Sequence, residues 1–212
     1  MSVIVTEIFH SIQGESSHAG RPCTFVRLSG CNLRCSWCDT SYSWDAGQPM
    51  SRKDVLDAVA RHRCRLVELT GGEPLAQRET PLLAANLLER GYEVLVETNG
   101  TLPIHVLDRR VTAIVDIKCP SSGMHTSTDW SNLERLREKD ELKFVIADRQ
   151  DFDYAVGIVR RILPQTRHIH FSPVLAQLPP AELAAWILED RLPIRLGLQL
   201  HKYIWDPDTR GV

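Results

Sequence analysis

Short apolar runs alternate with amphipathic segments along most of this chain, and this alternation limits the possible folds more than any other feature of the sequence. Eight runs have the length and composition of strands: Val3–Phe9, Thr24–Leu28, Leu66–Leu69, Glu93–Glu97, Ala113–Ile117, Glu141–Ile146, His168–Phe171 and Arg195–Leu200. Five segments have the helical period: Arg52–Arg63, Pro81–Arg90, Asn132–Lys139, Phe152–Leu163 and Ala181–Glu189. Because strands that alternate with helices are joined by crossovers, the sequence predicts an α/β fold built on parallel strands.

Capping residues mark the ends of two predicted helices, and one short connection limits how many strands the predicted parallel sheet can have. Ser51 is a suitable N-cap with Asp54 three residues later, and Gly91 follows the second helix as a C-terminal cap. The connection between Glu97 and Ala113 is short and broken by proline, which does not fit a complete eight-fold barrel. We therefore expect a partial (β/α)6-type barrel of mostly parallel strands, with the active site at the carboxyl ends of the strands.

The composition is that of an ordinary globular domain, and it excludes several classes of protein. Of 212 residues, 43% are hydrophobic and 25% are charged, with a formal net charge of -2. This charge offers no electrostatic footprint for a nucleic acid, and no apolar stretch approaches the ~18 residues of a membrane-spanning helix. No repeat, low-complexity tract or linker interrupts the sequence, so residues 1–212 are predicted to form one domain.

The first residues, Met1-Ser2-Val3-Ile4, lack the basic region and apolar core of a secretory signal. We therefore expect a cytoplasmic protein in a reducing compartment. There the six cysteines would serve as metal ligands or buried thiols and not as a disulfide framework.

Three of the cysteines form the motif C-x3-C-x2-C at Cys31, Cys35 and Cys38. Cysteine thiolates hold iron–sulfur clusters, and a four-iron cluster with only three protein ligands leaves one iron open to a small molecule. A structural zinc site is the alternative, with one of the other three cysteines as fourth ligand. Those three are isolated in or beside apolar stretches, as buried thiols often are. The spacing favours the cluster and leaves the zinc site open.

Polar residues follow the predicted strands at the points where the strands end. They are the cysteine loop, Thr70-Gly71-Gly72-Glu73-Pro74, Thr98-Asn99-Gly100, Lys118-Cys119, Ser172-Pro173 and His201-Lys202-Tyr203. Because parallel α/β sheets place their chemistry at the carboxyl ends of the strands, we expect these groups to share one site.

The cysteine loop and the segment 70–74 resemble the radical S-adenosylmethionine (SAM) superfamily. In that superfamily an aromatic residue precedes the last cysteine, as Trp37 does here, and SAM chelates the open iron through its amino and carboxylate groups. The sequence Gly71-Gly72-Glu73-Pro74 is similar to the strand end that receives the SAM amino group. The resemblance implies a 4Fe–4S cluster and SAM as cofactors.

Four further motifs resemble one family of that superfamily, the 7-carboxy-7-deazaguanine synthases. They are His10-Ser11-Ile12-Gln13-Gly14-Glu15, Glu97-Thr98-Asn99-Gly100-Thr101, Asp116-Ile117-Lys118 and His201-Lys202-Tyr203-Ile204. The resemblance implies conversion of 6-carboxy-5,6,7,8-tetrahydropterin to 7-carboxy-7-deazaguanine with loss of ammonia, in queuosine and deazapurine biosynthesis. It also implies magnesium as a third cofactor, a flavodoxin or ferredoxin as electron donor, and a homodimer.

The resemblance assigns roles to individual residues. Cys31, Cys35 and Cys38 would ligate the cluster, and Thr40 would bind magnesium through its hydroxyl. The expected SAM contacts are Trp37, Cys38, Asp39, Gly72, Glu73, Asp116, Ile117, Lys118 and Ser172. The expected substrate contacts are Ile12, Gln13, Gly14, Glu15, Arg27, Thr70, Glu97 and His201. Among these, the planar guanidinium of Arg27 suits the substrate carboxylate.

Three features depart from the family pattern. Ser172-Pro173 stands where Gln-Pro is common, and Asp116 replaces an expected serine. The segment Trp205–Val212 extends beyond the usual end of the family, so its role is not assigned by the resemblance.

Two other functions share part of this pattern. A glycyl-radical activase would have the same cysteine loop and SAM motifs, but it would not need the Gln13-Gly14-Glu15, Arg27 and Thr40 set. A non-catalytic zinc module would use the cysteines only to stabilise the fold.

Overall fold

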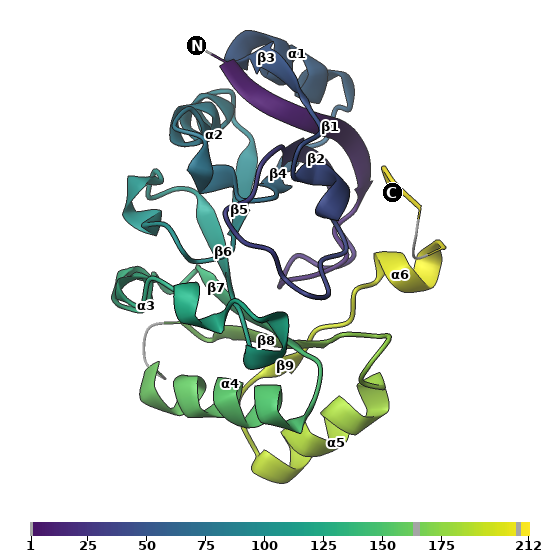
Figure 1. Ribbon diagram of the computed structural model, residues 1–212. Helices are drawn as coiled ribbons and strands as arrows, with labels where there is room; N and C mark the ends of the chain where they lie inside the picture. The colour runs from purple at the N-terminus through teal and green to yellow at the C-terminus, as the bar shows by residue number, and fades with distance from the viewer. Residues whose placement is uncertain (1, 163–165, 207–208) are drawn as a thin grey trace.

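The computed structural model describes residues 2–162, 166–206 and 209–212, which form one curved nine-stranded sheet with most of the helices packed on its outer side (Figure 1). The strand order is β3-β1-β2-β4-β5-β6-β7-β8-β9. The strands are β1 (Ser2–Ile12), β2 (Pro22–Leu28), β3 (Gln48–Ser51), β4 (Leu66–Gly71), β5 (Glu93–Thr98), β6 (Thr112–Ile117), β7 (Glu141–Ile146), β8 (His168–Pro173) and β9 (Arg195–Leu196). The helices are α1 (Arg52–Arg61), α2 (Thr80–Glu89), α3 (Ser131–Arg135), α4 (Arg149–Ile162), α5 (Pro180–Asp190) and α6 (His201–Ile204).

The neighbouring strands β2, β4, β5, β6, β7 and β8 are all parallel, and they curve into a partial barrel. This arrangement confirms the predicted α/β class and the partial barrel of mostly parallel strands. The loop after β2 and the short helix α6 lie on the concave side of the sheet (Figure 1).

Strand β1 runs antiparallel to β2, with Ile12 opposite Pro22. The carboxyl end of β1 therefore lies beside the amino end of β2. As a result, the segment that follows Ile12 enters the barrel from the end opposite to the cysteine loop.

The interior of the sheet is built from continuously buried strands. All six residues of β7 are buried, as expected for a parallel strand covered on both faces. Helix α4 is attached to the sheet by Phe152, whose ring lies 5.7 Å from that of Phe171 on β8 in an edge-to-face contact. The Phe171 ring in turn lies 5.3 Å from that of Phe144 on β7.

The predicted helix ends are confirmed at two positions. The hydroxyl of Ser51 accepts a hydrogen bond from the backbone N–H of Asp54 at 3.2 Å, which caps α1. Gly91 has a φ of 81°, and its N–H donates to the carbonyl of Leu88 at 2.9 Å beyond α2.

Other boundaries differ from the prediction. Strand β3 was not predicted, because its residues Gln-Pro-Met-Ser show no apolar alternation and pair only through the backbone with the start of β1. The predicted strand Arg195–Leu200 ends at Leu196, since Gly197 packs against the Ser172 hydroxyl and the chain turns away towards α6.

Two helices also have different limits. Helix α3 ends at Arg135, four residues before the predicted end, because the backbone becomes extended at Leu136, which has a ψ of 140°. Helix α4 begins at Arg149, and Leu163, the predicted end of that helix, lies outside the described residues.

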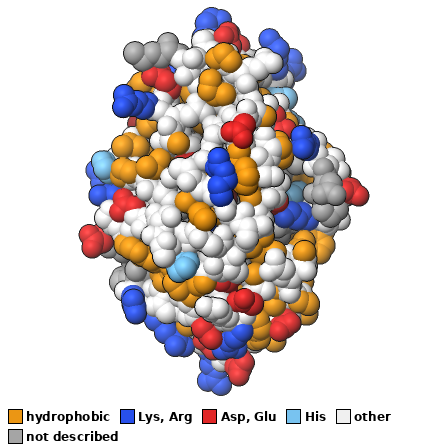
Figure 2. Space-filling view, viewed as in Figure 1, with side chains coloured by type: hydrophobic (Ala, Val, Ile, Leu, Met, Phe, Trp, Pro, Cys, Tyr) orange, Lys and Arg blue, Asp and Glu red, His pale blue; other side chains and the backbone are white. Residues whose placement is uncertain are grey.

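Within the described ranges, no helix is long and apolar enough to cross a membrane. Figure 2 shows acidic and basic side chains interspersed on the visible face. This mixture agrees with the small formal net charge of -2.

Candidate active site

The three cysteines of the motif lie in the loop that follows β2, on the concave side of the sheet. The loop is folded by local hydrogen bonds: the N–H of Cys38 donates to the carbonyl of Cys35 at 3.3 Å, and the N–H of Leu33 donates to the Cys31 sulfur at 3.4 Å. Each of the three thiols is partly exposed and lines the same cleft. The loop therefore presents three sulfur ligands to one space, as a cluster with an open iron requires.

The Gly-Gly-Glu-Pro turn after β4 is in direct contact with the cysteine loop. The N–H of Glu73 donates to the carbonyl of Gly30 at 2.8 Å. A Cβ on Gly72 would lie 2.1 Å from that same carbonyl oxygen and 2.8 Å from the Cβ of Cys31. Only glycine fits at position 72, and this absence of a side chain allows the two motifs to meet.

The carboxylate of Glu73 is fully buried and joins the turn to the end of β5. It accepts hydrogen bonds from the Thr98 hydroxyl at 2.8 Å, the N–H of Asn99 at 2.7 Å and the N–H of Leu75 at 2.9 Å. Burial raises the pKa of Glu73, and these hydrogen bonds oppose that shift. The expected contact between Glu73 and the SAM amino group remains a prediction.

The cysteine loop is held from behind by hydrogen bonds to Ser121, a contact that the sequence analysis did not predict. The indole N–H of Trp37 donates to the Ser121 hydroxyl at 3.1 Å, and the Ser36 hydroxyl donates to the carbonyl of Ser121 at 2.7 Å. Ser121 is itself held by Asp151 on α4, which accepts from its N–H at 2.9 Å. A lone serine and a lone carboxylate have no spacing signal, so these positions could not be identified from the sequence.

The cysteine loop opens onto a cleft of about 1170 Å³. Most of the predicted site residues line it: Ile12, Gln13, Gly14, Glu15, Arg27, Cys31, Cys35, Trp37, Cys38, Asp39, Thr40, Thr70, Gly72, Glu97, Asp116, Lys118 and His201. Three predicted SAM contacts do not: Glu73, Ile117 and Ser172 lie in the wall behind it, each 2% exposed or less. Their contacts with SAM stay predictions.

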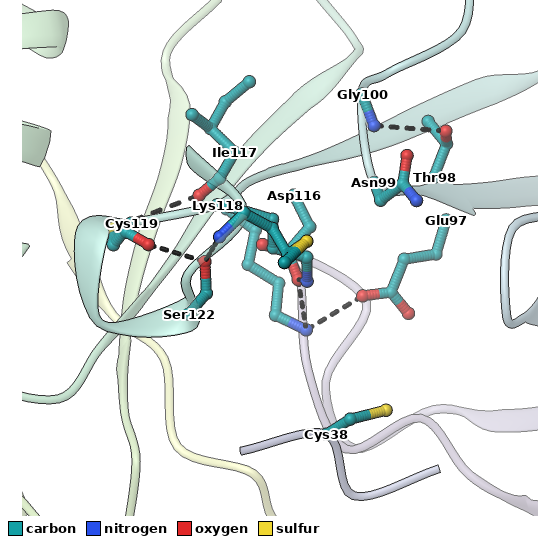
Figure 3. A network of polar contacts seen from close by, with 12 residues as sticks. Cys38, Glu97, Thr98, Asn99, Gly100, Asp116, Ile117, Lys118, Cys119 and Ser122 are labelled. Carbon is teal, nitrogen blue, oxygen red and sulfur yellow. Dashed lines mark hydrogen bonds and ion pairs between the residues drawn. The ribbon is translucent and has the colours of Figure 1, made fainter. Parts of the chain in front are cut away.

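Lys143, which was not predicted, lies at the centre of the charged groups in this cleft. Its ammonium forms an ion pair with Glu15, lies 2.8 Å from Glu97 Oε1 and lies 3.9 Å from Asp116 Oδ2. Figure 3 shows the side chains of Glu97 and Asp116 directed into the same space. Although burial alone would lower the pKa of Lys143, the carboxylates of Glu15 and Glu97 raise it well above its usual value.

A second polar pair extends towards the cysteine loop. Lys118 Nζ lies 2.9 Å from Asp116 Oδ2 and 5.4 Å from the centre of the Trp37 ring. The other oxygen of Asp116 is buried and has no hydrogen-bond partner among the described residues. This acceptor lines the cleft and fits a bound ligand with N–H or O–H donors.

The Gln13 side chain is already engaged within the protein. Its Oε1 accepts from the N–H of Glu15 at 2.9 Å, and its amide nitrogen donates to the buried carboxyl of Glu68 on β4. Burial, together with the nearby carboxylates of Glu97 and Glu15, raises the pKa of Glu68 well above its usual value. Glu68 was not predicted, because it lies inside an apolar strand.

The two motifs from opposite ends of the sequence meet as expected. The N–H of Leu200 donates to the carbonyl of Gly14 at 3.0 Å, and the Gln199 amide donates to Glu15 Oε1 at 2.7 Å. A Cβ on Gly14 would lie 2.2 Å from Nδ1 of His201, so the imidazole packs directly on this glycine. Burial lowers the pKa of His201.

Arg27 is held at one edge of the cleft with its side chain 15% exposed. Its Nε donates to Glu7 Oε1 at 2.7 Å, and the Tyr42 hydroxyl donates to the same oxygen at 2.7 Å. The other guanidinium N–H groups donate to none of the described residues, which leaves them for an anionic ligand.

The described residues include no group of three or more His, Cys, Asp or Glu side chains placed to hold a single metal ion. This finding does not favour the zinc module, whose four ligands converge on one ion. A 4Fe–4S cluster differs, because each cysteine binds a separate iron and the sulfur atoms stand further apart. The three partly exposed thiols facing the cleft fit that requirement.

Residues 25–146 match the family model described as the radical SAM superfamily, so the chain is a radical SAM protein. The 7-carboxy-7-deazaguanine synthase of Koribacter versatilis is 44% identical, with 98% of this chain and 99% of the relative covered, and that of Chlorobaculum tepidum is 46% identical, with 98% and 96% covered. This chain belongs to the 7-carboxy-7-deazaguanine synthase family.

The crystal structure of QueE from Escherichia coli is similar in fold, with a TM-score of 0.78 over 94% of both chains at 23% identity. These comparisons confirm the family inferred from the motifs, and they favour neither the glycyl-radical activase nor the zinc module. Membership of the radical SAM superfamily implies the 4Fe–4S cluster and SAM.

Proposed function

We propose that this chain converts 6-carboxy-5,6,7,8-tetrahydropterin to 7-carboxy-7-deazaguanine with loss of ammonia, in queuosine and deazapurine biosynthesis. One observation carries the proposal: a single cleft joins the cysteine loop and Gly72 to Gln13–Glu15, Arg27 and His201. Its volume of about 1170 Å³ is sufficient for two small molecules side by side. The names of the relatives, 7-carboxy-7-deazaguanine synthases, support the same substrate.

The protein groups bind and orient the substrate. The free N–H groups of Arg27 suit the pterin carboxylate, and the carboxylates of Glu15 and Glu97 suit the amino and ring N–H groups. The Thr70 hydroxyl donates to Glu97 Oε2 at 3.3 Å, which restrains that carboxylate. His201, packed on Gly14, closes this side of the cleft.

When bound, the cluster and SAM supply the radical chemistry that removes a hydrogen atom from the substrate. Cys31, Cys35 and Cys38 would hold the cluster, while Trp37, Gly72 and the free oxygen of Asp116 would contact SAM. The contribution of the chain is to align the substrate hydrogen and to exclude water from the cleft.

Magnesium would bind at Thr40. Its hydroxyl lies 3.8 Å from the Cys38 sulfur and lines the cleft, so it offers one hard oxygen next to the cluster loop. One oxygen is sufficient, because magnesium usually keeps several waters and takes further ligands from its substrate.

The remaining assignments follow from the family resemblance and from general features of the chain. We propose a homodimer that receives electrons from a flavodoxin or ferredoxin. The continuous nine-stranded sheet supports one domain over residues 1–212. The six free cysteines support a cytoplasmic location, where thiols stay reduced.

An anaerobic assay tests this function. The reconstituted and reduced protein would be mixed with SAM, magnesium and 6-carboxytetrahydropterin, and the products would be followed by mass spectrometry. Loss of one ammonia from the pterin with SAM regenerated would support the synthase. Cleavage of SAM with the pterin unchanged would reject this substrate and favour an activase, and failure to cleave SAM with a complete cluster would reject radical chemistry.

A further inference from the structure

Lys143 is a buried cation that the roles assigned above do not use. It lies on β7, where every residue is buried, and its side chain is 7% exposed. Taking an ammonium out of water is costly unless it is paired. The position is therefore stable only because acidic partners surround the ammonium.

The partners come from three separate parts of the fold. Glu15 follows β1, Glu97 is on β5, and Asp116 is on β6. Glu15 and Glu97 belong to the side of the cleft assigned to the substrate. Asp116 pairs with Lys118 beside Trp37, on the side assigned to SAM.

The cleft has more acidic than basic groups at this point. Glu68 adds a fourth carboxyl, and its polar contact is with the Gln13 amide. If the Lys143 ammonium were removed, the carboxylates of Glu15 and Glu97 would face each other and Glu68 with no cation between them. Like charges in a poorly solvated site repel, so these side chains would move apart or take up protons.

We propose that Lys143 is a positioning residue: it fixes the carboxylates of Glu15 and Glu97 relative to Asp116, so that the pterin is held in register with SAM. This inference rests on the proposed function. Lys143 acts through its acidic partners and has no assigned contact of its own with the substrate. Its removal should therefore weaken pterin binding and alignment while leaving SAM binding nearly intact.

The first test uses the Lys143→Met variant as the cluster-loaded protein without reductant, so that no turnover occurs. Calorimetric titration would give the dissociation constants for the pterin and for SAM separately. We expect the constant for the pterin to rise about 10- to 100-fold, the effect of disturbing hydrogen bonds to charged groups. The constant for SAM should change by about threefold or less, because Lys118 still pairs with Asp116.

A second measurement uses the reduced protein. In the Lys143→Met variant, more deoxyadenosine should form for each 7-carboxy-7-deazaguanine, because a misaligned substrate escapes the radical step. Lys143→Arg, which keeps the charge, should recover part of the pterin affinity. The control Lys53→Met removes an ion-paired but exposed lysine on α1 and should change neither constant.

A double variant, Lys143→Met with Glu97→Gln, distinguishes a folding defect from a positioning defect. It removes one carboxylate together with the cation, and its thermal midpoint is compared with that of Lys143→Met. Recovery of the thermal midpoint in this double variant would show that Lys143→Met is destabilised by unbalanced charge, and weaker pterin binding with unchanged SAM binding in the folded Lys143→Met protein supports the proposal. Equal weakening of pterin and SAM binding in Lys143→Met, or unchanged pterin binding, would overturn it. Failure of the unmodified protein to convert the pterin would instead reject the proposed function itself.

Discussion

Gly72 shows how much of the site depends on the size of one side chain. A Cβ at this position would lie 2.1 Å from the carbonyl oxygen of Gly30 and 2.8 Å from Cys31 Cβ. Real Cβ atoms do not approach backbone atoms so closely, so a larger residue would push the cysteine loop away from β4.

We predict that Gly72→Ala lowers cluster retention and the thermal midpoint, because the loop that holds Cys31 must shift. Iron content per chain and thermal unfolding would measure both effects. Gly157→Ala is the matched control, since nothing lies within 4 Å of a Cβ there and the residue is exposed on α4. The control should stabilise the protein by about 0.5–1 kcal/mol. Normal iron content in Gly72→Ala would contradict the close contact.

A second prediction concerns Thr40. Removing the hydroxyl in Thr40→Val should lower turnover roughly tenfold or more, because a bound metal contributes several kcal/mol to the reaction. SAM binding should be nearly unchanged, whereas Thr40→Ser should keep most of the activity and its magnesium dependence. Steady-state rates at varied magnesium and SAM titrations would compare the variants. An equal loss of turnover and SAM affinity in Thr40→Val would rule out the magnesium assignment.

At the scale of elements, the connection between β1 and β2 is fastened to the start of β7. Glu141, fully buried, accepts a hydrogen bond from the N–H of Ser17 at 2.9 Å and a second from the Ser17 hydroxyl. Its carboxylate also lies 2.9 Å from Nε2 of His170 on β8. This attachment positions the segment Gln13–Glu15 in the cleft.

We predict that Glu141→Gln lowers the free energy of unfolding by about 1.5–3 kcal/mol at pH 7, the range for hydrogen bonds to charged groups. Burial alone would raise the pKa of Glu141, but His170 and Ser17 bring it below the usual value of 4.5. The carboxylate therefore stabilises the fold above pH 4.5, and this contribution is lost as the pH falls through the lowered pKa. The difference in unfolding free energy between Glu141→Gln and the unmodified protein should stay constant from pH 7 to about 4.5 and narrow as the pH falls further, through the lowered pKa.

Urea unfolding at several pH values would measure this difference. Glu134→Gln is the control, because that carboxyl is exposed on α3. A difference that stays constant as the pH is lowered below 4.5, throughout the range in which the protein remains folded, would show that the carboxylate charge is not involved.

Elements with a regular pattern were predictable, and elements shaped by their neighbours were not. The apolar runs gave β4 to β8 within two residues at each end, because buried parallel strands are nearly continuous in hydrophobicity. Strand β3 forms only through backbone pairing with β1, and β9 is cut short where Gly197 meets Ser172. Neither the backbone pairing of β3 nor the early end of β9 is indicated by the residues of the strand itself.

The candidate site divides in the same way. Spaced motifs such as C-x3-C-x2-C located the residues that line the cleft, since spacing survives in the sequence. Lys143 and Glu68 were not predicted as site residues, because a single charged residue in an apolar strand looks like a polar residue on the solvent-facing side of that strand. Their importance comes from partners 27 to 128 positions away in the sequence: Asp116 is the nearest partner of Lys143 along the chain and Glu15 the farthest.

In the whole molecule, the two ends of the chain close the same cleft. Thr209, Arg210, Gly211 and Val212 line it together with the residues after β1. The guanidinium of Arg210 lies 4.0 Å from the centre of the Tyr42 ring, and the Tyr42 hydroxyl donates a hydrogen bond to Glu7 on β1. The last four residues of the chain therefore form part of the cleft wall, a position that the sequence did not indicate.

We predict that Arg210→Ala raises the KM for the pterin about two- to fivefold and leaves kcat nearly unchanged, because an exposed cation–π contact contributes about 0.5–1 kcal/mol. Steady-state kinetics would measure the effect, with Arg210→Lys expected to restore part of it. A fall in kcat with an unchanged KM would contradict a role in closing the cleft.

The antiparallel direction of β1 has a consequence for how this enzyme could be diversified. Because β1 places Gln13–Glu15 at one end of the barrel and β2 places the cysteine loop at the other, the residues proposed to bind the substrate and those proposed to bind the cluster are encoded in different stretches of chain. Exchange of the connection between β1 and β2 would alter ligand choice while the radical-generating machinery stays untouched. Lys143 pairs with Glu15 from that connection, so a graft that omits a matching acid would leave the buried ammonium without one of its partners.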